Sequence, residues 1–297
     1  MNPFRHTAFA LCFGLLLGAA TPPTAYFGQT PPGAKAVVFA PGFICTKDTF
    51  AMNGAFSPDG REFYYTVTNG AWDTFQIWRT RLQEGTWTEP APVRFFADKE
   101  TFEPCFAPDG RRLFFTAGTV ANTDIHFVEK GSEGWGQPVR LPDVISSSAH
   151  EMFASVSTLG AIYFGRSGDI WCSRLEGGQY RKAEPLGPPV NSDKHNVGDP
   201  LISPQEDFLI HTQAEGPGGL GQMDLYIRYR TKQGTWTEPF NLGPEINSPE
   251  FECGPSLTPD GKYLLFTRRE KWRTGNPSKI YWISADFIRQ LRPLRHR

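Results

Sequence analysis

The chain has 297 residues, and its 30 lysines and arginines nearly balance 31 aspartates and glutamates, for a formal net charge of −1. That balance provides no basic surface for nucleic acid, so we predict no nucleic-acid partner. With 39% apolar and 21% charged residues the chain can bury a core, which excludes wholesale disorder. The 30 glycines, 26 prolines and 24 phenylalanines are typical of short strands joined by frequent turns and exclude a helical bundle.

The first 20 residues have the pattern of a secretory signal. Arg5 precedes an apolar run at residues 7–20, which ends in Gly18-Ala19-Ala20. This run is too short to cross about 30 Å of hydrocarbon, but it has the charge, apolar centre and small-residue exit of a cleaved signal. An uncleaved membrane anchor is the alternative. We predict export to the periplasm or out of the cell, a linker at residues 21–35, and no membrane span in the mature chain.

Four cysteines remain after this signal: Cys45, Cys105, Cys172 and Cys253. Four in so long a chain do not make a disulfide scaffold, and no pair has the C-x-x-C spacing of zinc or thioredoxin sites. Buried free thiols are therefore the expected state.

One turn sequence recurs five times. The turns begin at residues 57, 107, 157, 203 and 258, at intervals of 50, 50, 46 and 55, and the first reads Ser-Pro-Asp-Gly. Proline fixes φ at the first central position, and Asp-Gly completes the reversal between two strands. An aromatic-rich strand follows each turn, as at residues 62–66 (EFYYT). A third strand comes next, and a fourth opens with a glycine and an aromatic residue, as at residues 85–87 (GTW).

Four short antiparallel strands in units of about 50 residues, repeated five times, predict an all-β fold: a five-bladed β-propeller occupying residues 36–291 as one domain. The fifth unit lacks a fourth strand, because residues 285–291 have a helical pattern. The spare strand at residues 36–40 is expected to complete the last blade, which closes the ring and removes an exposed edge. Residues 292–297 form a basic tail.

These repeats resemble the units of TolB-type, WD-repeat-like propellers. The resemblance rests on the S-P-D-G turn, the D-I-Y-like third strand and the G-x-W-x-x-P fourth strand, and it covers about residues 36–291. The segments LGPPVNS (186–192) and LGPEINS (242–248) are similar to inter-blade linkers of exported propellers. The resemblance implies the fold and export but no particular activity, since such propellers include docking modules, accessory domains of enzymes and some polysaccharide lyases. The third and fourth turns depart from the pattern.

The two faces of such a propeller differ in their connections. The repeated turns share one face, the turn face, and their tightness suggests a structural role. The opposite face carries long, dissimilar loops at residues 67–73, 117–122, 165–168, 212–223 and 268–278. Binding residues concentrate on varied loops held by a rigid scaffold. We therefore predict that this variable-loop face is functional, with Trp72 and Trp272 in two of its loops.

Polar residues are expected to reach the central channel from the innermost strands. Counting back four residues from each turn gives Asn53, Glu103, Phe153, Asp199 and Gly254, and near two of these lie His150, Glu151 and Glu252. We expect the four carboxylates to crowd around the axis at the channel mouth. Three interpretations stay open: they accept hydrogen bonds from backbone N–H groups of neighbouring blades, they bind a ligand or a hard cation such as calcium, or they perform acid–base catalysis.

Other motifs are weak. His150, His195 and His211 fall on the variable-loop face, where three imidazoles would suit a transition metal, but no spacing enforces their convergence and solvated loops are the plainer interpretation. No Gly-x-Ser-x-Gly elbow is present. We predict no cofactor, with a divalent cation such as calcium as the alternative.

Two functional hypotheses follow. The first is an exported, monomeric, non-catalytic binding module that takes a protein segment or an oligosaccharide at Asn53, Trp72, Glu103, His150, Glu151, Asp199, Glu252 and Trp272. The alternative is a glycan-active hydrolase or lyase in which Glu103, Asp199 and Glu252 act as acid, base and pKa modulator. That alternative requires paired carboxylates about 5–10 Å apart.

Overall fold

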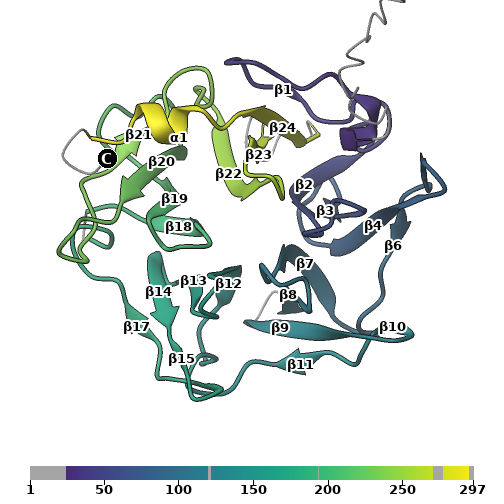
Figure 1. The fold of residues 1–297 in the computed structure, drawn as a ribbon, viewed down its shortest axis with the longest axis horizontal. Helices are drawn as coiled ribbons and strands as arrows, with labels where there is room; N and C mark the ends of the chain where they lie inside the picture. Colours follow the sequence, from purple (N-terminus) through teal and green to yellow (C-terminus); the bar gives the residue numbers. More distant parts are fainter. Residues whose placement is uncertain (1–24, 120–121, 193, 270–276, 294–297) are drawn as a thin grey trace, which may run out of the picture.

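The computed structural model describes residues 25–119, 122–192, 194–269 and 277–293. Within these ranges, five antiparallel sheets stand around one axis, and Figure 1 looks down that axis. Each sheet is one blade, and in the first four blades the strands follow outward from the innermost one in sequence order. The five-bladed β-propeller predicted from the repeats is confirmed.

The blades share one order of strands. The innermost strands are β2 (Phe50–Phe56), β7 (Glu100–Phe106), β12 (Glu151–Val156), β18 (Val197–Ile202) and β22 (Phe251–Leu257). The second strands are β3 (Glu62–Thr68), β8 (Arg112–Thr119), β13 (Ile162–Arg166), β19 (Phe208–Gln213) and β23 (Tyr263–Arg269). The third strands are β4 (Phe75–Gln83), β9 (Asn122–Gly131), β14 (Asp169–Ser173), β20 (Asp224–Tyr229) and β24 (Lys279–Ser284). The outermost strands are β6 (Ala91–Pro92), β11 (Val139–Arg140), β17 (Glu184–Pro185), β21 (Phe240–Asn241) and, in the fifth blade, β1 (Val37–Val38).

The core lies between the blades because both faces of each sheet are apolar. Successive side chains of a strand point to opposite faces. Phe115 of β8 therefore packs in one cluster with Tyr64 of the first blade. Its neighbour Phe114 packs in another cluster with Phe164 of the third blade. All four rings are almost completely buried, so each second strand joins two blade interfaces.

The N-terminal strand closes the ring as predicted. β1 is the outer strand of the fifth blade, where Val37 lies opposite Trp282 and Val38 opposite Tyr281. The next residue, Phe39, is completely buried and contacts Trp282 with ring centroids 5.2 Å apart. Figure 1 shows β1, at the start of the described chain, beside β24 near its end. This pairing joins the two ends of the propeller in one sheet.

The predicted fourth strands are split in the structure. The glycine–aromatic segments form short hairpins at the ends of the third strands: β5 (Thr86–Trp87) pairs with β4 and β10 (Gly134–Trp135) with β9, while β15 (Leu175–Glu176) pairs with β16 (Gln179–Tyr180). The first blade is completed only later, where β6 pairs with Trp78 and Arg79. Pro90 separates the two pieces, and proline has no N–H for a sheet ladder.

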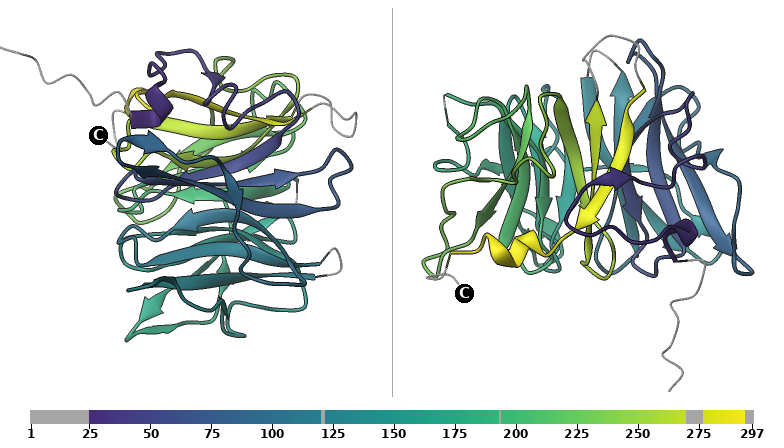
Figure 2. Two further views of the ribbon diagram at one scale, coloured as in Figure 1. Left: turned by 90° about the vertical axis from the view of Figure 1, so that its right-hand side faces the viewer. Right: turned by 90° about the horizontal axis from the view of Figure 1, so that it is seen from above.

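The turn face carries two short helices as well as the repeated turns. In the first turn, Asp59 Oδ1 accepts hydrogen bonds from Ser57 Oγ (2.6 Å) and from the Arg61 N–H (3.0 Å). The 3-10 segment η1 (Ala25–Gly28) and the helix α1 (Phe287–Gln290) lie on the same face of the ring in Figure 2. None of the helices in the described ranges has the length and apolarity needed to cross a membrane.

Candidate functional site

Five equivalent residues on the innermost strands surround the axis. Asn53, Glu103, Phe153, Asp199 and Gly254 all have φ between 45° and 58°, and the register of each innermost strand shifts at this point. Such a shift is a β-bulge, which leaves one residue out of the ladder and re-aims its side chain. The constant distance to the repeated turns predicts that these positions are equivalent, and their shared φ and register shift confirm that equivalence.

Hydrogen bonds at the bulges connect neighbouring blades. The Glu103 N–H donates to Thr66 Oγ1 of the preceding blade, and the Asn53 N–H donates to Thr267 Oγ1, both at 2.9 Å. These threonines lie near the ends of β3 and β23 and are fully buried. The spacing of the turns does not indicate this role. Their signal is the threonine that ends the second-strand motifs EFYYT and YLLFT, with Thr116 in the same place in RLFFT.

Two of the five residues are carboxylates that bind the following blade. Glu103 Oε2 accepts hydrogen bonds from Thr116 Oγ1 (2.7 Å) and from the Phe153 N–H (2.9 Å). Asp199 Oδ2 accepts one from the Gly254 N–H (2.9 Å). Glu103 is 5% exposed and Asp199 9%. One oxygen of each carboxyl group thus makes the inter-blade hydrogen bond that the sequence analysis considered.

Burial strongly favours the neutral form of both acids. It raises the pKa of Glu103 to about 8, and the nearby charge of Asp199 adds to this, against the lowering effect of Thr116 and Phe153. Burial raises the pKa of Asp199 to about 7, against the Gly254 hydrogen bond and the positive charge of Arg269. At neutral pH, Glu103 therefore holds a proton and Asp199 is close to its midpoint.

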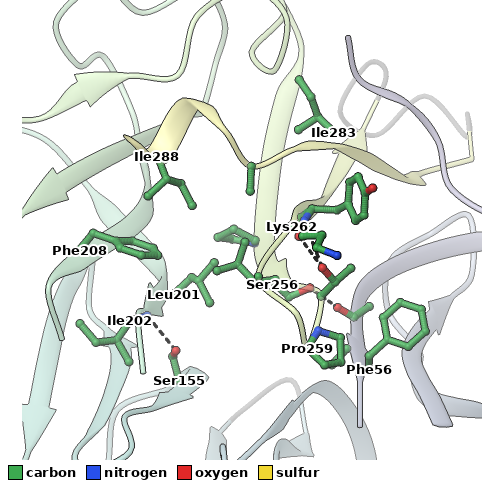
Figure 3. A pocket seen from close by; sticks show the side chains of 18 of the residues that line it. Phe56, Ser155, Leu201, Ile202, Phe208, Ser256, Pro259, Lys262, Ile283 and Ile288 are labelled. Carbon is green, nitrogen blue, oxygen red and sulfur yellow. Dashed lines mark hydrogen bonds between the residues drawn. The ribbon is translucent and has the colours of Figure 1, made fainter. Parts of the chain in front are cut away.

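A cavity of about 1430 Å³ rises from these residues to the turn face. Asn53, Glu103, Phe153, Asp199 and Gly254 line it, together with the turn-proximal halves of all five innermost strands. Four turn prolines surround its mouth: Pro58, Pro108, Pro204 and Pro259. Figure 3 shows Leu201, Phe208 and Ile288 directed into it, so the strands of the fourth blade and helix α1 form one wall.

The position of this cavity corrects the sequence-based site. The acids were expected at a channel mouth on the variable-loop face, but they lie midway along their strands and the cavity opens on the turn face. The variable-loop ends of the innermost strands do not line it. Each innermost strand begins at the variable-loop face. Glu103 is the fourth residue of β7 and Asp199 the third of β18, so both acids lie below that surface.

Glu151 and Glu252 do not line this cavity, although we expected them beside Glu103. Each lies in a buried clamp. Glu252 Oε1 accepts from Arg268 Nε at 2.7 Å and from Ser248 Oγ. The Glu151 clamp repeats this arrangement with Arg166 and Ser147. Both glutamate side chains are 0% exposed, so they fasten the inter-blade linkers to the second strands.

The other predicted residues are scattered. Trp72 is half-buried on the variable-loop face, with the Arg269 guanidinium 3.3 Å from its ring centroid. His150 is exposed, and its Nδ1 lies 3.1 Å from Thr123 Oγ1. His195 is half-buried. Trp272, the signal at residues 1–20 and most of the basic tail lie outside the described residues.

The three histidines do not converge. His211 is completely buried, and its Nε2 accepts a hydrogen bond from Arg228 Nε at 2.9 Å. No group of three or more histidine, cysteine, aspartate or glutamate residues in the described ranges is arranged to hold a metal ion. Cys45, Cys105, Cys172 and Cys253 are free thiols.

The raised pKa values of Glu103 and Asp199 predict that the free energy of unfolding falls as the pH rises. In the unfolded chain Glu103 and Asp199 lose their protons near pH 4, whereas the folded protein keeps them up to about pH 8 and 7. Their stabilising contribution is thus full below pH 4 and is lost as the pH rises through the folded values. The Glu103→Gln variant should lose less stability between pH 4.5 and 8 than the wild type, by at least about 1.4 kcal/mol, the equivalent of one pKa unit. Urea titrations at several pH values measure this.

His211 provides the internal control. Burial and Arg228 lower its pKa to about 3. His211 therefore reduces the free energy of unfolding as the pH falls below about 6.5, whereas the two acids reduce it as the pH rises. Because His211 is the same in both proteins, the difference between their pH profiles isolates Glu103. Parallel profiles would show that Glu103 ionises at an ordinary pH in the folded protein.

Comparison with known proteins supports the fold. No family model matches the sequence, and no curated protein matches it significantly. Among solved structures, TolB from Acinetobacter baumannii is 16% identical with a TM-score of 0.45, over 78% of this chain and 54% of that one. A putative TolB from Agrobacterium tumefaciens is 18% identical with a TM-score of 0.48, over 77% and 73%. A calcium-binding protein, regucalcin, from Agrobacterium tumefaciens is 13% identical with a TM-score of 0.50, over 85% and 94%. At such identities the likeness concerns the fold alone: the chain is a five-bladed β-propeller whose structural neighbours include TolB proteins and other propellers.

Proposed function

We propose that this protein is an exported, non-catalytic binding module whose axial cavity receives a segment of a protein partner. The observation that carries the proposal is the cavity of about 1430 Å³, open on the turn face and lined by all five blades. Ligand sites are typically concave and mostly apolar, with a few polar groups at fixed positions. Export rests on the signal-like sequence at residues 1–20.

The wall of the cavity favours a peptide over a sugar. Alanine, valine, leucine, isoleucine, proline and phenylalanine side chains together predominate in it, as at Ala107, Val156, Leu201 and Phe208. Such a wall gains free energy by removing apolar peptide side chains from water. Polar side chains also line the wall, among them Ser155, Ser256 and Lys262, and these can hydrogen-bond to the backbone of a bound peptide. A protein segment is therefore the occupant that we select from the two predicted ligand classes.

A pair of tryptophan substitutions tests the site. Leu201 lines the cavity, whereas Leu220 is 45% exposed in a loop of the variable-loop face. Peptides are first selected on the wild-type protein from a random displayed library, and the tightest is labelled as the probe. Leu201→Trp, which fills the cavity, should weaken probe binding at least tenfold, and Leu220→Trp should leave it unchanged. The reverse order of effects would place the binding site on the variable-loop face and contradict the proposal.

A glycan-active enzyme remains the second candidate because one cavity holds two acids with raised pKa values, as acid–base catalysis needs. Glu252 is no longer part of that set, since Arg268 and Ser248 bind its carboxylate. Incubation with neutral and acidic oligosaccharides, followed by product analysis, separates the candidates. Turnover by the wild type that disappears in Glu103→Gln would favour the enzyme.

A further inference from the structure

The floor of the axial cavity is formed by three polar side chains at equivalent bulges. Asn53, Glu103 and Asp199 come from the first, second and fourth blades, all line the cavity, and all are more than nine-tenths buried. Asn53 and Asp199 meet at Gly254: Asp199 accepts the Gly254 N–H, and a Cβ added to Gly254 would lie 2.0 Å from Asn53 Nδ2. Glu103 is within electrostatic reach of Asp199. The three groups therefore form one cluster.

Each of these groups keeps an oxygen that no described residue uses. Asn53 Oδ1 is buried and has no hydrogen-bond partner. The inter-blade hydrogen bonds occupy Oε2 of Glu103 and Oδ2 of Asp199, and no donor from the described ranges reaches Oε1 or Oδ1. A buried acceptor without a donor is costly, so natural proteins leave few of them. Asn53 Oδ1 is such an acceptor, and Glu103 and Asp199 each add an oxygen that accepts no hydrogen bond from a described residue. These three oxygens at the end of one cavity match a ligand that brings several donors.

The charges around the floor favour a cationic ligand. Two acids face the cavity here, and Arg269 and the Cys253 thiol act on Asp199 from the fifth blade. Arg269 itself lies over the Trp72 ring, with its guanidinium carbon 3.3 Å from the centroid. With Arg269 as the one positive charge acting on Asp199, both acids keep raised pKa values, and an incoming positive charge would favour their ionised forms.

We propose that this floor binds a primary ammonium group. The group has three N–H donors and one positive charge, which match the three free oxygens and the excess acid, and the apolar wall accepts its alkyl stem. The inference rests on the proposed function: the ammonium is a lysine side chain or the free N-terminus of the bound segment. Binding ionises the acids, and the proton that each held passes to solvent.

Hexylamine and hexanol are the first probes, because they share an alkyl stem and differ in the charged end. Calorimetry on the full mature chain should show hexylamine binding at least tenfold more tightly than hexanol. Its affinity should rise between pH 6 and 8, with protons released to the buffer. Equal affinities for the two compounds would overturn the proposal. Displacement of hexylamine by calcium chloride alone would also overturn it, by showing a metal site.

Matched variants then locate the binding group. Glu103→Gln and Asp199→Asn should each weaken hexylamine binding at least tenfold, with folding checked by circular dichroism. Glu245→Gln removes the same charge from an exposed residue on the cavity wall and should have no effect. If both floor variants bind hexylamine as tightly as the wild type, the floor is not the ammonium site.

Two peptides distinguish the sources of the ammonium. One contains lysine and has an acetylated N-terminus, and the other has a free N-terminus and no lysine; whichever binds more tightly identifies the source. The same peptides separate this inference from the proposed function. A peptide whose binding is lost in Leu201→Trp but is unchanged in Glu103→Gln supports a peptide-binding cavity and refutes the ammonium site.

Discussion

Replacing Phe39 with alanine should lower the free energy of unfolding by about 3–5 kcal/mol, the usual range for a buried phenylalanine. Phe39 is completely buried at the closure of the ring, with Phe63 and Trp282 each 5.2 Å away between ring centroids. These contacts join the N-terminal segment to the first and fifth blades, so the truncation opens a cavity where the two ends of the chain meet. Urea denaturation of residues 21–297 measures the loss.

Val37 supplies the matched control. It lies two residues away in the same closing segment, pairs with Trp282 and is 40% exposed. Val37→Ala should cost less than about 1 kcal/mol, since surface substitutions usually have small effects. Equal losses for the two variants would mean that Phe39 packing does not hold the ring closed.

Replacing Arg268 with alanine should cost about 3 kcal/mol or more, because it leaves a buried carboxylate without its counter-charge. Arg268 Nε donates to Glu252 Oε1, its second nitrogen donates to the Ile246 carbonyl at 2.7 Å, and its guanidinium covers the Tyr281 ring at 4.6 Å. The loss should appear in the same urea titrations. Adding Glu252→Gln to this variant should recover part of it, since a neutral amide needs no counter-charge.

An exposed ion pair provides the contrast. Arg181 and Glu176 lie 2.8 Å apart but are about 60% exposed, so Arg181→Ala should cost less than about 1 kcal/mol. A similar loss for Arg268→Ala and Arg181→Ala would contradict the structural role assigned to Glu252. It would also return Glu252 to the candidates for ligand binding.

Part of the site was predictable from local patterns, and part was not. The equivalence of Asn53, Glu103 and Asp199 follows from their constant distance to a recurring turn, because each unit folds alike. Their depth does not follow, since a bulge changes how far each residue advances along the axis. Glu252 has the same residue type and a nearby position, yet Arg268 lies sixteen residues away and only the pairing of β22 with β23 brings them together.

By itself, the sequence determined the fold. A strand period of two, turn chemistry and a repeat of about 50 residues are local properties, and a sheet that is apolar on both faces has few ways to bury itself. Only the tertiary structure decided where the site lies. The turn face holds the cavity because the turn-proximal halves of the five innermost strands line it, and α1 and the fourth blade complete the wall. Some carboxylates line the cavity and others pair with an arginine. Contacts between residues distant in the chain decide between the two, and no local pattern encodes such contacts.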